Sequence, residues 1–223
     1  LKIHPWAEQA KFAKTGGEAN AVAVRIARSY SKKDNIAICG YHGWHDWYLA
    51  ANLKSSENLK GHLLSGLDPA GVPRKLEGSS IPFDYNDFNQ IQDIVSKGDI
   101  GVIIMEVCRN VEPKNNFLNK VRKLATDNGI VLIFDEITSG FRGVLGGIHK
   151  QYDVEPDISV FGKTLGNGYG ISAIIGENNV MDYAQSSFIS STFWTERIGV
   201  VAALKTIEIM ERDCVPEKIT KTG

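Results

Sequence analysis

The stretch Ile130-Val131-Leu132-Ile133-Phe134-Asp135-Glu136 decides the fold class of this chain of 223 residues. Five apolar residues in a row predict a strand buried on both faces, as in a parallel sheet covered by helices on each side. Two carboxylates follow directly, and open α/β sheets bind their ligands at the edge where the strands end. A second apolar run, Ile158–Phe161, is followed by Gly162 and Lys163. We therefore expect an acid and a lysine at two neighbouring strand ends.

Apolar runs and amphipathic periods alternate along the rest of the chain. Strands are expected at residues 35–40, 100–105, 130–134, 158–161 and 172–176. Helices are expected from Thr15, which would be the N-cap of the first, and then over residues 87–95, 116–128 and 196–211. This order predicts an α/β fold with a mostly parallel central sheet and helices on both faces. No linker divides the chain, so one large domain over residues 1–223 is predicted.

Two further segments have features of their own. The predicted helix over residues 196–211 carries the apolar residues Ile198, Val201, Ala202, Leu204 and Ile209. Residues 53–77 lose periodicity and gain serine, glycine, aspartate and proline, which predicts a long irregular connection. Long connections in compact domains often form lids or walls of functional sites.

The composition argues against several classes of partner. The chain is 43% hydrophobic and can bury a sizeable core, and its net charge of −1 comes without a basic block. Neither nucleic acid nor an anionic membrane is therefore expected as a partner. No run approaches the roughly 18 apolar residues of a membrane span. Three widely spaced cysteines favour reduced thiols in a cytoplasmic protein over a disulfide framework.

Thr15-Gly16-Gly17-Glu18 opens the first predicted helix. Two glycines at a helix N-terminus let backbone amides point at an anion, although an ordinary capped helix begins in the same way. No Gly-Lys-Ser/Thr follows the glycines, so the segment is not a Walker A loop. The first helix is therefore a candidate anion site, with a plain capped helix as the alternative.

Four aromatic residues and two histidines lie within residues 41–48, directly after the first predicted strand. Such a cluster is costly to expose, so it lines a core edge or a pocket, where Tyr41 would form an aromatic stacking platform. His42 and His45 beside Asp46 also suggest a metal site. No third ligand follows nearby and Gly43 separates the histidines, so no metal is expected.

Lys163, flanked by Phe161, Gly162 and Leu165, is expected to be buried. An unpaired ammonium in apolar surroundings is costly, so such a lysine has a depressed pKa or a covalent partner. This setting fits a Schiff-base lysine, and a surface lysine at a strand end is the alternative. The strand ending in Asp135 is also similar to the magnesium-binding strand of P-loop ATPases, but the missing Walker loop disfavours a nucleotide-dependent ATPase.

These motifs together resemble the large domain of a class III aminotransferase of fold type I, which depends on pyridoxal 5′-phosphate (PLP). Within that class the chain is most similar to the glutamate-1-semialdehyde 2,1-aminomutase branch. The resemblance covers essentially the whole chain. It rests on Thr15-Gly16-Gly17-Glu18-Ala19, Tyr41-His42-Gly43 with Asp46, Phe134-Asp135-Glu136-Ile137 with Gly140-Phe141-Arg142, Gly162-Lys163 with Gly166-Asn167-Gly168, and Ser191-Thr192-Phe193-Trp194.

On the ring side of the cofactor, the resemblance implies two catalytic residues. Lys163 would form the Schiff base with PLP and later move a proton between substrate and cofactor. Asp135 would keep the pyridine nitrogen protonated, so that the ring acts as an electron sink. Tyr41 would stack on the ring with Ile137 packed behind it, and His42 would complete this part of the cofactor-binding set.

On the phosphate side, the resemblance implies that the amides of Gly16 and Gly17, with the Thr15 hydroxyl, hold the phosphate at a helix N-terminus. Thr192 matches the family threonine that reaches the phosphate from the partner subunit. A homodimer with a shared active site is therefore implied.

Some positions depart from the family pattern. Thr138 stands where many class III transaminases have glutamine, and the chain reads Gly-Phe-Arg where they read Gly-Phe-Gly-Arg. Both differences favour the aminomutase branch. In the other direction, Thr-Gly-Gly replaces Ser-Gly-Thr, Glu106-Val107 replaces Glu-Pro, and a bulky stretch around Trp194 and Arg197 replaces Gly-Asn-Pro. The last change favours a substrate larger or differently charged than a small semialdehyde.

The implied function is PLP-dependent amino-group transfer on a small amino acid or amino-aldehyde. An aminomutase that returns nitrogen to its own substrate and a transaminase with a separate donor need the same half-reactions, so both stay open. A catalytically incompetent fragment or assembly subunit is the alternative, because the family's N-terminal segment and small C-terminal domain are not evident in these residues.

Overall fold

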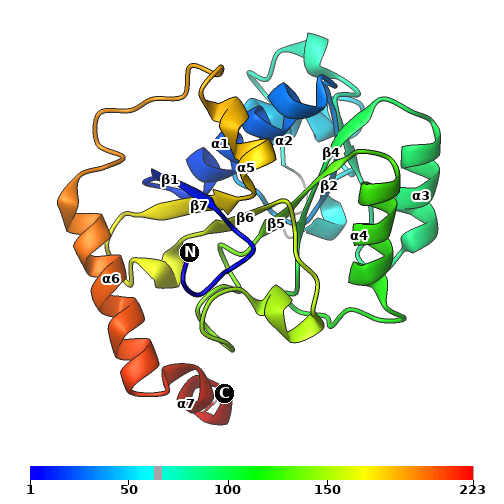
Figure 1. The fold of residues 1–223 in the computed structure, drawn as a ribbon. Helices are drawn as coiled ribbons and strands as arrows, with labels where there is room; N and C mark the ends of the chain where they lie inside the picture. The colour runs from blue at the N-terminus through cyan, green and yellow to red at the C-terminus, as the bar shows by residue number, and fades with distance from the viewer. Residues whose placement is uncertain (63–66, 223) are drawn as a thin grey trace.

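The computed structural model describes residues 1–62 and 67–222. Its centre is a seven-stranded sheet in the order β1-β7-β6-β5-β4-β2-β3 (Figure 1). The strands are β1 (Gln9–Ala13), β2 (Asn35–Cys39), β3 (Ser80–Pro82), β4 (Ile100–Glu106), β5 (Val131–Asp135), β6 (Ile158–Phe161) and β7 (Ser172–Gly176). Neighbours from β3 to β6 are parallel, and β7 is antiparallel to both β6 and β1. The prediction of a mostly parallel α/β sheet is confirmed.

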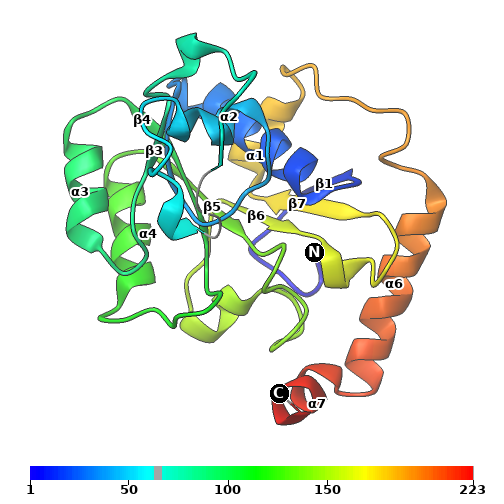
Figure 2. The ribbon, with the colours of Figure 1, turned by 180° about the vertical axis from the view of Figure 1, so that it is seen from behind.

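Helices cover both faces of this sheet (Figures 1 and 2). They are α1 (Gly16–Ser31), α2 (Asp46–Leu49), α3 (Phe88–Ser96), α4 (Phe117–Asp127), α5 (Asn178–Met181), α6 (Arg197–Arg212) and α7 (Val215–Thr222). Apolar residues of α1 pack with one set of strand side chains, and those of α3 and α4 pack with the other set. Among the described residues, no helix is long and apolar enough to cross a membrane.

Strand β5 shows why its sequence is an unbroken apolar run. Successive side chains of a strand point to opposite faces, and both faces of this one are covered. Val131 and Ile133 belong to the core under α1, whereas Leu132 and Phe134 belong to the core under α3 and α4. Every residue of β5 is buried, so a polar residue is tolerated only at its end, where Asp135 lies.

Helix α1 begins as its sequence predicts. The Thr15 hydroxyl accepts a hydrogen bond from the Glu18 amide at 3.3 Å, and the Glu18 carboxylate accepts from the Thr15 amide at 3.0 Å. This reciprocal capping box fixes the direction in which the chain enters the helix. The helix then crosses the sheet with a buried apolar face.

Other parts of the chain differ from the expectation. The edge strands β1 and β3 and the short helix α7 were not predicted. On α6 the apolar side chains are largely outside, with Ile198 67%, Val201 61% and Leu204 64% exposed. The connection over residues 53–77 is irregular apart from short 3-10 turns, and its residues 63–66 lie outside the described part of the chain.

Candidate active site

The candidate site lies at the edge where the parallel strands end. Asp135 closes β5 and is paired in register with Glu106 at the end of β4. Tyr41 follows β2, and Lys163 follows β6. Parallel strands place their carboxyl ends at the same edge, so the topology brings together residues separated by more than a hundred positions in sequence.

Asp135 is held by three donors. Its Oδ2 atom lies 2.7 Å from Nδ2 of Asn20 and 2.7 Å from Nδ1 of His42, and its Oδ1 accepts from the Ile137 amide at 3.0 Å. A carboxylate only accepts, so His42 donates through Nδ1. Asp135, Asn20 and His42 are each at most 2% exposed. The acid therefore has a fixed orientation in a water-excluded setting.

Asn20 is a site residue that sequence reasoning missed. It occupies a buried position on α1, on the face that packs against the sheet. A polar side chain on an otherwise apolar helix face needs a hydrogen-bond partner, which is the signal that could have identified it.

The start of α1 forms a cradle for an anion. In the part of the chain that the structure describes, no acceptor meets the amides of Gly16 and Gly17, whereas the Glu18 amide is bonded within the cap. A Cβ atom added to Gly16 would lie 3.1 Å from Ile137, and one added to Gly17 would lie 2.8 Å from His45. The two glycines thus permit close packing while their amides stay free at the positive end of the helix.

Gly43 packs against this cradle. Its φ of +106° is a conformation that side-chain-bearing residues rarely adopt, and an added Cβ would lie 3.0 Å from Cα of Gly17. The segment that carries Tyr41 and His42 is therefore fitted to the helix start by two glycine backbones.

Gly43→Ala is expected to destabilise the protein by about 1–3 kcal/mol, because alanine is strained at this φ and meets the backbone of Gly17. Urea unfolding measures the loss. Gly143→Ala is the matched control, since an added Cβ there has no atom within 4 Å. Equal stability of the two variants would show that the close approach of the loop and helix is not required.

Tyr41 is half-buried. Its backbone is held by a hydrogen bond, whereas its ring makes an aromatic contact. The Tyr41 amide donates to Oε2 of Glu106 at 3.0 Å. The ring meets Tyr48 edge to face, with centroids 6.1 Å apart, and the Tyr48 hydroxyl donates to the Gly40 carbonyl at 2.9 Å. These contacts hold the backbone and the ring of the candidate stacking platform in place.

Lys163 is exposed, so the expectation of a buried lysine is wrong. Its apolar neighbours in sequence, Phe161 and Leu165, pack into the core beside α6, and the lysine between them points away from that core. The ammonium Nζ donates to the Thr138 hydroxyl at 2.8 Å. The lysine is therefore positioned by one hydrogen bond, with its amine accessible.

Ile137 connects the two halves of the site. Its side chain contacts the position of Gly16 at the helix start, and a Cβ added to Gly162 would lie 2.8 Å from its Cδ1. The anion cradle and the lysine turn therefore both pack against one half-buried side chain, directly after Asp135.

Thr192 lies on the long connection between α5 and α6, which extends away from the sheet (Figure 1). It is exposed. Its expected role, from a partner subunit, stays a prediction. Across residues 1–62 and 67–222, no three His, Cys, Asp or Glu side chains are grouped to hold a metal ion.

Glu106 is a second buried acid at this edge, 7% exposed. Burial, and then the charge of Asp135, raise the pKa of Glu106 above its ordinary value of 4.5, while His42, the Tyr41 amide and Arg109 oppose the rise. Between 4.5 and the raised value the folded state binds more protons than the unfolded state. In that window the contribution of Glu106 to stability therefore falls as pH rises.

We expect Glu106→Gln to gain stability relative to the wild type as pH rises through this window, by about 1.4 kcal/mol for each unit of pKa elevation. The glutamine does not titrate, so the wild type alone loses stability there. Urea unfolding of both proteins from pH 4.5 upward measures the difference. A pH-independent difference would mean that the pKa of Glu106 is not raised.

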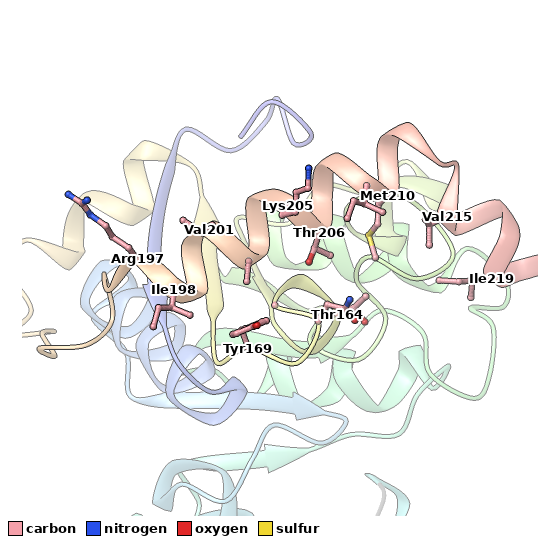
Figure 3. Close-up of a pocket in the computed structure, with 14 residues that line it drawn as sticks. Thr164, Tyr169, Arg197, Ile198, Val201, Lys205, Thr206, Met210, Val215 and Ile219 are labelled. Carbon is pink, nitrogen blue, oxygen red and sulfur yellow. The ribbon is translucent and has the colours of Figure 1, made fainter.

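A groove of about 710 Å³ runs between α6 and the loop after Lys163 (Figure 3). Thr164 and Tyr169 contribute from the loop, and Ile198, Val201 and Met210 from α6. Ile198 and Val201, two of the exposed apolar residues of α6, thus line a groove next to the loop that follows the candidate lysine. Arg197 lies at one end of this groove (Figure 3).

Known proteins are similar to this chain over most of its length. Residues 1–223 match the family described as aminotransferase class-III. Among curated relatives, the 3-aminobutyryl-CoA aminotransferase of Cloacimonas acidaminovorans is 41% identical over 100% of this chain and 52% of its own length. The glutamate-1-semialdehyde 2,1-aminomutase of Nitrosopumilus maritimus is 34% identical, covering 93% of this chain and 50% of its own length.

Solved structures show the same fold. The PLP internal aldimine form of the FumI protein of Sphingopyxis sp. MTA144 aligns with a TM-score of 0.82 and 25% identity, over 95% of this chain and 49% of that one. An omega-transaminase of Sphaerobacter thermophilus aligns with a TM-score of 0.79 and 23% identity, over 93% of this chain and 51% of that one. The chain spans about half the length of the proteins that it matches.

Proposed function

The chain belongs to the class-III aminotransferase family, and from this premise we propose that it carries the PLP site of an enzyme that transfers amino groups. One observation supports the proposal above the others. Packing around Ile137 joins an anion cradle with unbonded amides to a turn with an accessible lysine, next to a buried carboxylate. These are the three chemical groups that PLP needs from a protein.

The residues present fit this cofactor. The free amides of Gly16 and Gly17 and the hydroxyl of Thr15 would hold its phosphate. Asp135 would face the pyridine nitrogen, supported by His42. These assignments use the fixed carboxylate and the helix N-terminus, both of which are formed by the described residues alone.

The ring and the reactive carbon would be held by the remaining candidates. Tyr41 would cover one face of the ring, and Ile137 would cover the other. The accessible Nζ of Lys163 would bind the cofactor's aldehyde carbon as a Schiff base. Thr138, which accepts from this amine at 2.8 Å, would set its direction.

PLP when bound supplies an electron sink for the substrate carbon that loses its proton. The chain supplies the proton handling. Asp135 would keep a proton on the ring nitrogen, because the donors Asn20, His42 and the Ile137 amide hold its carboxylate in one orientation. Lys163 takes a proton from one substrate carbon and returns it to another position, as a general base and then a general acid.

Spectroscopy of the full-length protein tests the proposal. Addition of PLP is expected to produce a visible absorbance band, and addition of an amino donor is expected to bleach it as the amino group moves to the cofactor. Protein that stays colourless with saturating PLP would overturn the proposal and favour an incompetent fragment or assembly subunit.

The identity of the substrate distinguishes two versions of the proposed function, an aminomutase and a broader transaminase. The relatives named glutamate-1-semialdehyde aminomutase favour a small amino-aldehyde, whereas the 41% identical relative is named for an acyl-CoA amine. The half-buried Trp194 and exposed Arg197 favour the larger, charged substrate. Turnover of glutamate-1-semialdehyde with no turnover of 3-aminobutyryl-CoA or other amine acceptors would exclude the broader transaminase.

We further infer a homodimer with a shared site. Phe188 and Phe193 flank the segment that carries Thr192 and are 93% and 68% exposed. Large apolar side chains exposed on one short segment are typical of protein–protein contact surfaces. Light scattering of the purified protein measures the mass. Cytoplasmic location remains an expectation from the cysteine content.

A further inference from the structure

Arg109 lies three residues beyond the end of β4 and belongs to none of the motifs discussed above. Its Nη2 atom donates to Oε1 of Glu106 at 2.8 Å, and its Nη1 atom donates to the carbonyl of His62 at 3.3 Å. The Arg109 side chain is 18% exposed. One guanidinium therefore bonds two residues that come from different segments of the chain.

Each of these two residues bonds the backbone at the candidate ring platform. The second oxygen of Glu106 accepts from the Tyr41 amide at 3.0 Å. Nδ1 of His62 lies 2.9 Å from the Gly40 amide nitrogen and 3.1 Å from the Gly40 carbonyl oxygen, so the imidazole bonds the Gly40 backbone in either tautomer. Arg109 thus begins two hydrogen-bond paths that end on the backbone of consecutive residues, Gly40 and Tyr41.

The turn at Gly40 has little freedom to adjust. Its φ is +121°, and an added Cβ would lie 2.6 Å from Oε2 of Glu106. The Glu106 carboxylate therefore packs directly on the residue that directs the chain from β2 to Tyr41. A shift of this carboxylate would move the backbone that carries the Tyr41 ring.

The ion pair between Arg109 and Glu106 strengthens the hydrogen-bond path that runs through Glu106. Burial and the charge of Asp135 raise the pKa of Glu106, and Arg109 opposes that rise. Burial also lowers the pKa of His62, and its hydrogen bond with the Gly40 backbone opposes that change. Removal of the guanidinium would leave a buried carboxylate without its counter-ion, which is costly and favours a rearrangement.

We propose that Arg109 is a positioning residue for Tyr41, acting through Glu106 and His62. The guanidinium holds both residues in place, and these fix the backbone at Gly40 and Tyr41 that orients the Tyr41 ring. Only the consequence for cofactor binding rests on the proposed function. The hydrogen-bond path itself requires no cofactor.

Hydrogen exchange in the full-length protein without PLP tests the path directly. In Arg109→Met, exchange of the Gly40 and Tyr41 amides is expected to rise about tenfold or more, the effect of weakening a hydrogen bond to a charged group. Amides of β5 are expected to keep their rates. Arg74→Met, at an exposed arginine, is the matched control and should change neither.

Arg109→Lys separates positioning from packing. Lysine restores the charge but cannot reach both acceptors with a planar fork, so its exchange rates are expected to lie between those of the wild type and Arg109→Met. A packing role would make lysine and methionine equivalent. Equal rates in these two variants, unchanged rates in Arg109→Met, or a rise that includes β5 would each overturn the proposal.

The affinity for PLP distinguishes this proposal from the proposed function. Arg109→Met is expected to bind PLP roughly ten- to a hundredfold more weakly than the wild type. A wild type that does not bind PLP would refute the proposed function, while exchange would still decide the hydrogen-bond path. Normal affinity in Arg109→Met would refute the positioning of the ring.

Discussion

Lys163→Ala is expected to lower the rate of amino-group transfer by about 10²- to 10⁴-fold, since the variant loses its general base. It also loses the amine that would bind PLP covalently, so the visible absorbance of the bound cofactor should shift. Stability should change by less than about 0.5 kcal/mol, because the side chain is exposed and its one hydrogen bond is with Thr138. Stopped-flow absorbance with a saturating amino donor measures the transfer.

The control for this variant is Lys97→Ala. Lys97 is also exposed, but it lies just before β4. It is therefore at the amino ends of the parallel strands, opposite the candidate site. Its removal should leave the absorbance and the transfer rate unchanged. Transfer by Lys163→Ala within tenfold of the wild type would mean that another amine handles the proton, and the site assignment would be wrong.

Asp135→Asn is expected to reduce transfer by about 10²- to 10³-fold, the magnitude of one preorganised electrostatic group. Asparagine keeps the shape but has no charge to hold a proton on the pyridine nitrogen. Its amide group also meets the donors of Asn20 and His42, so a donor would face a donor. We expect a loss of about 1–3 kcal/mol in unfolding free energy from that mismatch.

Two measurements separate these effects. Transfer is followed at a temperature where urea unfolding shows the variant to be folded, so that the rate reports chemistry. Asp93→Asn, at an exposed aspartate on α3, is the matched control and should be neutral in both measurements. A normal rate in folded Asp135→Asn would exclude Asp135 as the partner of the ring nitrogen.

The strands of the central sheet were predictable because both faces are buried. Ile130–Phe134 and its counterparts have no alternative to a core position, so apolar runs alone identify them. The edge strands β1 and β3 were not predictable, because Gln9–Ala13 and Ser80–Pro82 are only partly buried and carry no such run. The exposure of the apolar residues of α6 was not predicted. The period of the sequence identifies an apolar face of the helix, but it does not show whether another element packs against that face.

The candidate site was predictable where sequence neighbours act together and less so elsewhere. Thr15, Gly16 and Gly17 form one local cap, and Asp135 directly follows its strand. The exposure of Lys163 depends on the direction in which the side chains of Phe161 and Leu165 pack. The sequence around Lys163 does not reveal that direction. Asn20 and Arg109 act through contacts that only the folded topology creates.

The reversed direction of β7 has a consequence for the lysine. Phe161 at the end of β6 pairs with Ala173 near the start of β7, so the chain leaves and re-enters the sheet at the same edge. The segment that carries Lys163 is thus tethered at both ends by neighbouring strands, with Ser172 bonded to the Thr15 carbonyl. A crossover helix would have carried the chain to the far edge. The hairpin instead confines the amine to a short closed loop, so ordering it against a ligand costs little conformational entropy.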